Sequence, residues 1–174
     1  MEGPPINLDQ ESKKLELDGP ILDLDHIAIA VTDLDATIRW YTAALGFRLV
    51  ERRETRGERT AMNSAVLQAG AATVVLIQGT TPDSQVSKFI AKFGAGVQHV
   101  AFGVRDLKEA MRVALRIGAV ADTEIIEGEG IRQIFLRRDA ESGVRVELIE
   151  RRGGNFSDDT VERLFRTFEA KDLY

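Results

Sequence analysis

The sequence has no cysteine, and only two of its 174 residues are histidines. The absence of cysteine excludes disulfide bonds, a thiol nucleophile and thiolate metal ligands. No apolar run approaches the roughly 18 residues that a membrane-spanning helix needs. The arginine pairs lie beside carboxylates and the net charge is −5, so neither a membrane nor a nucleic acid is an expected partner.

The composition suits one globular domain, with 44% hydrophobic and 29% charged residues. The N-terminal segment MEGPPINLDQESKKLELDG is polar and acidic and contains no apolar segment of the kind that a signal peptide has. We therefore expect a flexible leader over residues 1–22 and a cytoplasmic protein.

The first half of the chain alternates strand and helix signals. Asp33 is expected to cap the N-terminus of the helix that follows it, and Gly46 is expected to end that helix. Runs rich in Val and Ile and bounded by turn residues predict the strands. The expected elements are a strand at 24–31, a helix at 34–44, strands at 47–55, 60–68 and 72–78, and a short helix ending near 93.

The second half repeats this order. Asp106 caps a helix that Gly118 ends. The final helix has an apolar face formed by Val161, Leu164, Phe165 and Phe168. The expected elements are a strand at 96–104, a helix from 106 to 117, strands at 120–127, 131–138 and 144–150, and a helix at 158–171.

The two histidines occupy the same position of this repeat, in DHIAIAVTDL (25–34) and QHVAFGVRDL (98–107). A repeated βαβββ unit predicts an α+β fold of two modules related by a pseudo-twofold axis. Two curved four-stranded units would then present His26 and His99 to a common cleft. Imidazole is the commonest metal ligand among side chains, so a shared metal site is expected, although two ordinary core histidines are the alternative.

Residues 24–150 resemble the vicinal oxygen chelate superfamily, in which paired βαβββ modules form a cupped mixed β-sheet around one metal. A closer resemblance is to the catalytic C-terminal half of 4-hydroxyphenylpyruvate dioxygenase. It rests on segments in the same order: MNSAVL, SQV, GAGVQHVAF, RQIFLRR, VELIERR and GGNF…LFRTFE. The resemblance implies a domain over 23–152, with modules at 23–82 and 95–152, and a gating helix over 153–174.

The resemblance adds Glu147, in RVELIE, to the two histidines as a metal ligand. Two histidines and one carboxylate form the facial triad of non-haem Fe(II) oxygenases. Other divalent metals, such as Co, Ni, Mn or Zn, are expected to replace iron in vitro. Several relatives use a fourth ligand from the first module, and the alignment puts Val75 there. Valine cannot ligate, which leaves room for a bidentate 2-oxo acid and dioxygen.

The resemblance also implies the lining of the pocket. Phe156 and Phe165 match the helix that closes over the site. Arg145 departs from the dioxygenase, which has an aromatic residue at that position. It is expected to bind a substrate carboxylate, to pair with Glu147 or to reach solvent. The matched substrate-binding positions are Ser64, Gln85, Gln98, Gln133 and Phe135.

The leading hypothesis is an Fe(II) dioxygenase that acts on a 2-oxo acid related to 4-hydroxyphenylpyruvate by oxidative decarboxylation with hydroxylation, with no catalytic side chain beyond the metal centre. The segments LDHIAIAV, TPDSQVSKFIAKFGAGVQHVAF and SGVRVELIE also resemble methylmalonyl-CoA epimerase. Further alternatives are an extradiol dioxygenase, a metal-dependent thiol transferase and a drug-binding resistance module. A homodimer is a possible assembly.

Overall fold

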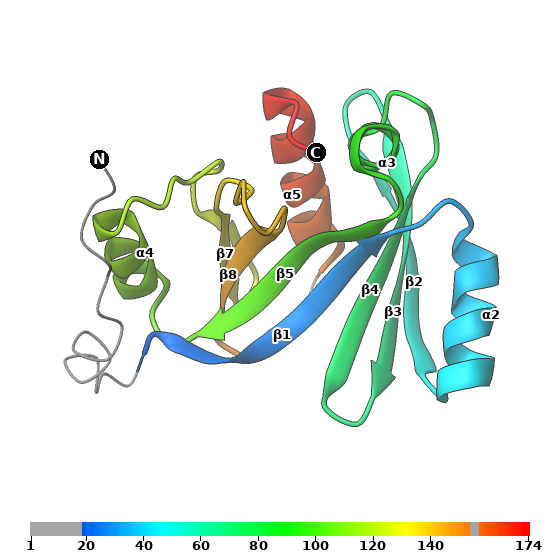
Figure 1. The fold of residues 1–174 in the computed structure, drawn as a ribbon, viewed down its shortest axis with the longest axis horizontal. Helices are drawn as coiled ribbons and strands as arrows, with labels where there is room; N and C mark the ends of the chain where they lie inside the picture. The colour runs from blue at the N-terminus through cyan, green and yellow to red at the C-terminus, as the bar shows by residue number, and fades with distance from the viewer. Residues whose placement is uncertain (1–18, 154–156) are drawn as a thin grey trace, which may run out of the picture.

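Two copies of one succession of elements build the computed structural model, which describes residues 19–153 and 157–174 (Figure 1). The first copy contains β1 (Ile21–Ala30), α2 (Leu34–Leu45), β2 (Arg48–Arg56), β3 (Ala61–Ala69) and β4 (Ala72–Gly79). Helix α3 (Gln85–Phe93) connects it to β5 (Gly96–Val104), α4 (Leu107–Arg116), β6 (Ile126–Gly128), β7 (Ile131–Phe135) and β8 (Arg145–Arg151). Helix α5 (Asp158–Lys171) follows.

The eight strands within the described residues form one curved mixed sheet in the order β2-β3-β4-β1-β5-β8-β7-β6. Strands β1 and β5 pair antiparallel at its centre, and each pairs in parallel with the last strand of its own module, β4 or β8. The expectation of paired modules in a cupped mixed sheet is confirmed. The modules are joined edge to edge within one chain, because β1 and β5 hydrogen-bond to each other.

The pairing gives the residues at the centre of the first module counterparts in the second. Ala28 lies opposite His99, and His26 lies opposite Ala101, so the two histidines are exchanged by the pseudo-twofold axis. Ala28 is also paired with Val75 on β4, while Ala101 is paired with Glu147 on β8. Val75 is therefore the counterpart of Glu147.

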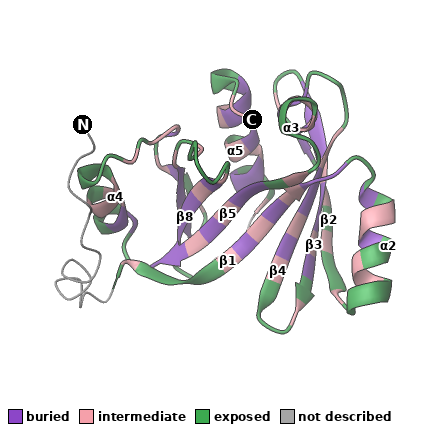
Figure 2. Cartoon of the chain, viewed as in Figure 1, coloured by how far each residue is buried: buried purple, intermediate pink, exposed green. Residues whose placement is uncertain are grey.

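Helices α2 and α4 cover the outer face of the sheet, whereas α3 and α5 lie on its inner face (Figure 1). The caps expected from the sequence form, because Asp33 accepts a hydrogen bond from Ala36 N at 2.8 Å and Asp106 accepts one from Glu109 N at 3.1 Å. Figure 2 shows the buried residues alternating along the central strands. The inner cluster contains Ala30, Met62, Ile77, Val86, Phe89, Val161 and Phe165.

Helix α5 contacts β2 and β6, the two outermost strands of the sheet, and so reaches across the open side of the cup. Near its C-terminal end, the Glu169 carboxylate accepts hydrogen bonds in the β2–β3 loop from Glu58 N and Thr60 N, both at 2.7 Å. Near its N-terminal end, Thr160 packs so closely on Gly128 that a β-carbon there would collide with it. The inner face is consequently enclosed between the sheet and this helix.

The segment 120–127 differs from the strand predicted for it. Only an isolated bridge from Ala121 to Leu136 and the short β6 are present, and β7 ends at Phe135. The Thr123 hydroxyl accepts the hydrogen bond from Phe135 N at 3.0 Å, and Asp122 N donates to Phe135 O at 2.9 Å. Through these contacts, residues 122 and 123 satisfy the backbone groups of Phe135 at the end of β7. The segment 120–127 therefore does not continue as a strand paired along β7.

Strand β1 begins at Ile21, before the predicted start at Leu24. Most of the expected leader, residues 1–18, lies outside the described residues. Among the helices that the structure describes, none has both the length and the apolar character needed to cross a membrane.

Candidate metal centre

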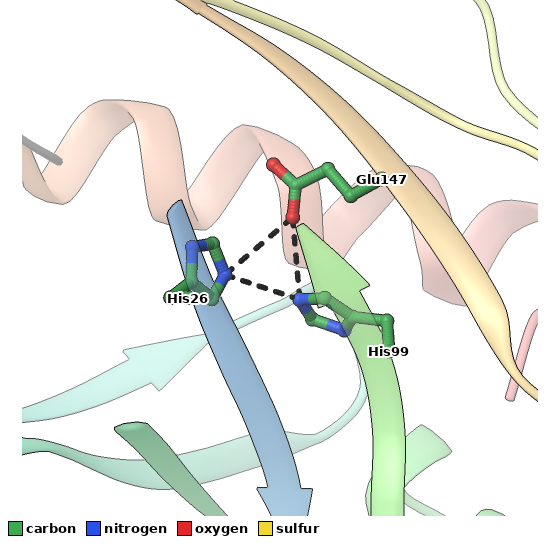
Figure 3. Close-up of side chains that lie close together, drawn as sticks. All are labelled: His26, His99 and Glu147. Carbon is green, nitrogen blue, oxygen red and sulfur yellow. Dashed lines mark hydrogen bonds and ion pairs between the residues drawn. The ribbon is translucent and has the colours of Figure 1, made fainter. Parts of the chain in front are cut away.

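His26, His99 and Glu147 converge on one point of the inner face (Figure 3). They lie on the adjacent strands β1, β5 and β8. The His26 Nε2 and His99 Nε2 atoms are 3.3 Å apart, and Glu147 Oε2 lies 3.5 Å from the first and 3.2 Å from the second. The exposed fractions of the three residues are 4%, 9% and 1%. The structure thus brings together the three residues that the sequence predicts.

These three groups fit a divalent cation. Donors about 2.0–2.1 Å from a shared metal and at right angles to one another lie roughly 3 Å apart, close to the observed separations. Glu147 Oε1 is buried without a hydrogen-bond partner, which is costly for a carboxylate unless another charge compensates it. Two nitrogens and one carboxylate oxygen suit a first-row transition metal.

Burial sets the protonation of the ligand atoms. It raises the pKa of Glu147 to about 7, in the absence of a cation beside the carboxylate. It lowers the pKa of His99 to about 3, and the nearby charges of Arg145 and Arg138 act in the same direction. His99 is therefore a neutral imidazole with a free lone pair, the form in which histidine binds metals.

The residue before each histidine holds the other nitrogen of the ring. Asp25 Oδ1 lies 2.7 Å from His26 Nδ1, and Asp25 also accepts hydrogen bonds from Arg151 at 2.5 and 2.8 Å. Burial favours the protonated form of Asp25, but the hydrogen bonds from Arg151 and His26 outweigh it and keep its pKa below the ordinary value. Gln98 Oε1 accepts from His99 Nδ1 in the equivalent place. Such outer partners fix the orientation of a ligating ring.

The sequence interpretation missed Asp25, although its position before His26 matches that of Gln98 before His99. It assigned Gln98 to the substrate. In the structure the Gln98 side chain contacts His99, and the backbone carbonyl oxygen of Gln98 accepts a hydrogen bond from Arg138 at 3.0 Å. Its substrate-binding role stays a prediction.

The predicted polar lining residues are buried on the inner side. Ser64 is 8% exposed and shares a face of β3 with Met62. Gln133 on β7 has no exposed surface, and neither atom of its amide group has a partner. Gln85 donates to the carbonyl oxygen of Phe168 at 3.4 Å, while its own Oε1 has no partner. Unpaired buried amides are uncommon and call for a ligand or water.

A row of rings runs from the triad to α5. Phe135 is fully buried and makes edge-on contacts with His99 and Phe168, with ring centroids 5.2 and 4.8 Å away. Arg145 lies over the Phe168 ring at 5.4 Å and donates to Asp122 at 3.0 Å, so it pairs with neither Glu147 nor solvent. The partner Asp122 was not foreseen, because it comes from the segment that was predicted as a strand.

Of the two gating residues, Phe165 is buried in the inner cluster with Met62 and Phe89. Phe156 lies outside the described residues. The gating role is a prediction for both.

The chain resembles known proteins along most of its length. An uncharacterised protein of Bacillus subtilis, YqjC, is 30% identical over 78% of this chain and 96% of its own length. The structure of methylmalonyl-CoA epimerase from Mycobacterium tuberculosis matches 80% of this chain and 95% of its own, with a TM-score of 0.66 and 30% identity.

A mutant of 4-hydroxymandelate synthase from Streptomyces coelicolor matches in fold with a TM-score of 0.77 at 22% identity, over 91% of this chain and 56% of that one. Residues 25–135 match the model of a family that includes glyoxalases, bleomycin resistance proteins and dioxygenases. The chain belongs to the glyoxalase/bleomycin resistance protein/dioxygenase superfamily.

Proposed function

We propose that the chain is an Fe(II)-dependent oxygenase that acts on a 2-oxo acid related to 4-hydroxyphenylpyruvate, with His26, His99 and Glu147 as the metal ligands. The proposal rests on the counterpart of Glu147, which is Val75. A symmetric site would have a fourth protein ligand there, whereas valine offers none. Three ligands leave one side of the metal open to a chelating substrate.

Bound Fe(II) would supply the redox chemistry of oxidative decarboxylation and hydroxylation, with dioxygen as the co-substrate. The side chains of the protein bind and orient the substrate. In this proposal the Ser64 hydroxyl and the Gln133 amide hydrogen-bond the substrate, and Phe135 packs against it. The burial of all three residues and the lack of a partner for the Gln133 amide support these roles. No side chain is required as a general base.

Helix α5 serves to exclude water. We assign residues 153–174 as a gating element over a metal-binding domain at 23–152, with Phe165 as its described apolar anchor. The contacts of α5 with both outermost strands support this role, because a helix that spans the opening must shift to admit a substrate.

The test is anaerobic reconstitution with Fe(II) followed by a panel of 2-oxo acids. A visible metal-to-ligand charge-transfer band, and oxygen uptake once air is admitted, are the expected results. Tight binding of a divalent metal with neither response to any 2-oxo acid would contradict the proposal.

An epimerase of the methylmalonyl-CoA type is the second candidate, because that enzyme from M. tuberculosis is 30% identical over most of both chains. Such a reaction needs a base that removes the proton next to a carbonyl. Exchange of that proton of methylmalonyl-CoA with solvent deuterium, in Co(II)-loaded protein without oxygen, would favour the epimerase.

The non-enzymatic alternative, a drug-binding module, predicts ligand binding that is indifferent to metal removal. Calorimetry before and after chelation of the metal separates it from both enzymes. A homodimer remains a prediction that light scattering of the purified chain tests.

A further inference from the structure

Cationic groups outnumber carboxylates beside the metal triad, around Asp122. The Asp122 carboxylate lies 3.0 Å from Arg145 and 3.5 Å from Arg137, and its backbone carbonyl accepts from Lys171 at 3.2 Å. The Arg138 guanidinium is close enough to Arg145 for the repulsion between the two charges to contribute to lowering its pKa, after burial. One carboxylate therefore faces several positive charges.

Arg145 is the most deeply buried of these cations, at 4% exposure. Asp122 occupies its Nη2, while Nε and Nη1 are buried without a hydrogen-bond partner. Leaving charged donors dry and unpaired is expensive, and a single ion pair does not satisfy a group with five N–H donors. The arrangement is complete only when an acceptor reaches the remaining N–H groups.

The position of Arg145 places those donors beside the metal triad. It is paired with His99 in the register of β5 and β8, and it lies two residues before Glu147 on the same face. Gln133, on the neighbouring strand β7, carries a buried amide group whose nitrogen and oxygen both lack a hydrogen-bond partner. The unsatisfied donors of the second module therefore lie on the same surface as the ligands.

We infer that Arg145 binds a second carboxylate of the substrate, so that the substrate class is a 2-oxo acid with one anionic group at the metal and another at this guanidinium. The assignment of the first group rests on the proposed function. The N–H donors on Nε and Nη1 are open to an acceptor, and a carboxylate is a planar anion whose geometry matches a guanidinium. Gln133 supplies the neutral polar contact between the two ends.

The experiment compares 2-oxo acids that end in a carboxylate with 2-oxo monocarboxylic acids of the same chain length. Anaerobic calorimetry on the Co(II)-loaded protein is expected to show tighter binding of the dicarboxylates by about tenfold or more, the size of a charge-assisted hydrogen bond. The preference should disappear in Arg145→Gln and persist in part in Arg145→Lys.

Arg137→Gln is the matched control, because Arg137 contacts the same carboxylate of Asp122 but its side chain is 66% exposed. It should keep the full preference. Circular dichroism and Co(II) affinity, measured on every variant, exclude a loss of fold or metal as the cause. An equal affinity of the wild-type protein for both series, or a preference that survives in Arg145→Gln, would overturn the inference.

A metal-free arm separates this inference from the proposed function. Glutarate, a simple dicarboxylate, should raise the unfolding temperature of the apo protein and of Arg137→Gln but not that of Arg145→Gln. If no 2-oxo acid binds at the metal but glutarate still protects through Arg145, the oxygenase proposal fails and the anion site stands. If 2-oxo acids bind at the metal without any effect of Arg145, the reverse holds.

Discussion

The two modules share a backbone arrangement but differ in what they present to the centre of the cup. Each contributes one histidine from its first strand. At the next equivalent position the first module has Val75, which packs against the apolar inner cluster, and the second has Glu147. The sheet register likewise makes Ser64 the counterpart of Gln133 and Val66 the counterpart of Phe135.

The two modules therefore contribute different kinds of side chain to the site. The second module carries the buried charges and amides, Arg145, Glu147 and Gln133, whereas the first supplies a ligand, a hydroxyl and an apolar wall. A symmetric fold thus encloses an asymmetric site. An anionic substrate would then bind in one orientation, because the buried guanidinium of Arg145 lies in the second module.

Of the changes considered, removal of the histidine of the second module should have the largest effect on the metal site that the two modules share. His99→Ala is expected to abolish divalent metal binding, with a loss larger than the roughly 10–100-fold that follows the removal of an outer partner. The fold should persist, because the strand pairing of β5 does not depend on the ring. Calorimetry with Co(II) and far-ultraviolet circular dichroism check both statements. Retained affinity would show that the two imidazoles do not share a metal.

Making the first module resemble the second sharpens the comparison. Val75→Glu places a carboxylate at the position equivalent to Glu147, so it should tighten metal binding and occupy one of the three open positions that a bidentate 2-oxo acid and dioxygen need together. Oxygen uptake with Fe(II) and a 2-oxo acid should therefore be lost. Val75→Leu is the control, since it adds bulk without a ligand. Unchanged oxygen uptake in the Glu variant would contradict the three-ligand site.

The outer partners of the two histidines offer a finer contrast. Asp25→Asn removes the carboxylate behind His26, and metal affinity should fall about 10–100-fold. Gln98→Glu places a carboxylate behind His99 and should move affinity the other way, because a charged acceptor makes the ring a better donor to the metal. Co(II) titrations of the two variants measure this. Equal effects in the same direction would show that the partners act only by packing.

The attachment of α5 differs between the modules in its dependence on pH. Burial tends to raise the pKa of Glu169, but hydrogen bonds from Thr60, Glu58 and Arg59 outweigh it and lower the pKa below 4.5. The stabilisation is therefore complete above pH 4.5 and is lost as the pH falls through the lowered value. Glu169→Gln should cost about 1–3 kcal/mol at pH 7.

That difference from the wild-type protein should shrink toward acidic pH in denaturant titrations. The contact of Thr160 with Gly128 in the second module contains no titrating group, so Thr160→Ser should show a small and pH-independent change. A constant penalty for Glu169→Gln across the pH range would argue against an ionised carboxylate at this position.

The repeat made much of the fold predictable from sequence. The capping residues Asp33 and Asp106 set the two module helices, and the repeated histidines indicated the pseudo-twofold axis. The convergence of His26, His99 and Glu147 followed from the repeat together with the family resemblance. These features are local or periodic, which is why sequence patterns contain them.

Long-range contacts were not predictable in the same way. The pairing of Arg145 with Asp122 depends on a segment that leaves the ladder, and the pattern of 120–127 alone favours a strand. Similarly, the contact of Glu169 with the β2–β3 loop joins residues far apart in the chain, and no periodicity indicates it. Both arise from side chains that satisfy buried polar groups in the folded state.

The pairing of β1 with β5 has a thermodynamic consequence. The two histidines lie on the strands that join the modules, so a bound cation links the halves and opposes their separation. Unfolding then becomes coupled to the concentration of free metal. A metal at 100 times its dissociation constant would add about 2.7 kcal/mol to the unfolding free energy. The midpoint of thermal unfolding would thereby report metal occupancy, with no substrate present.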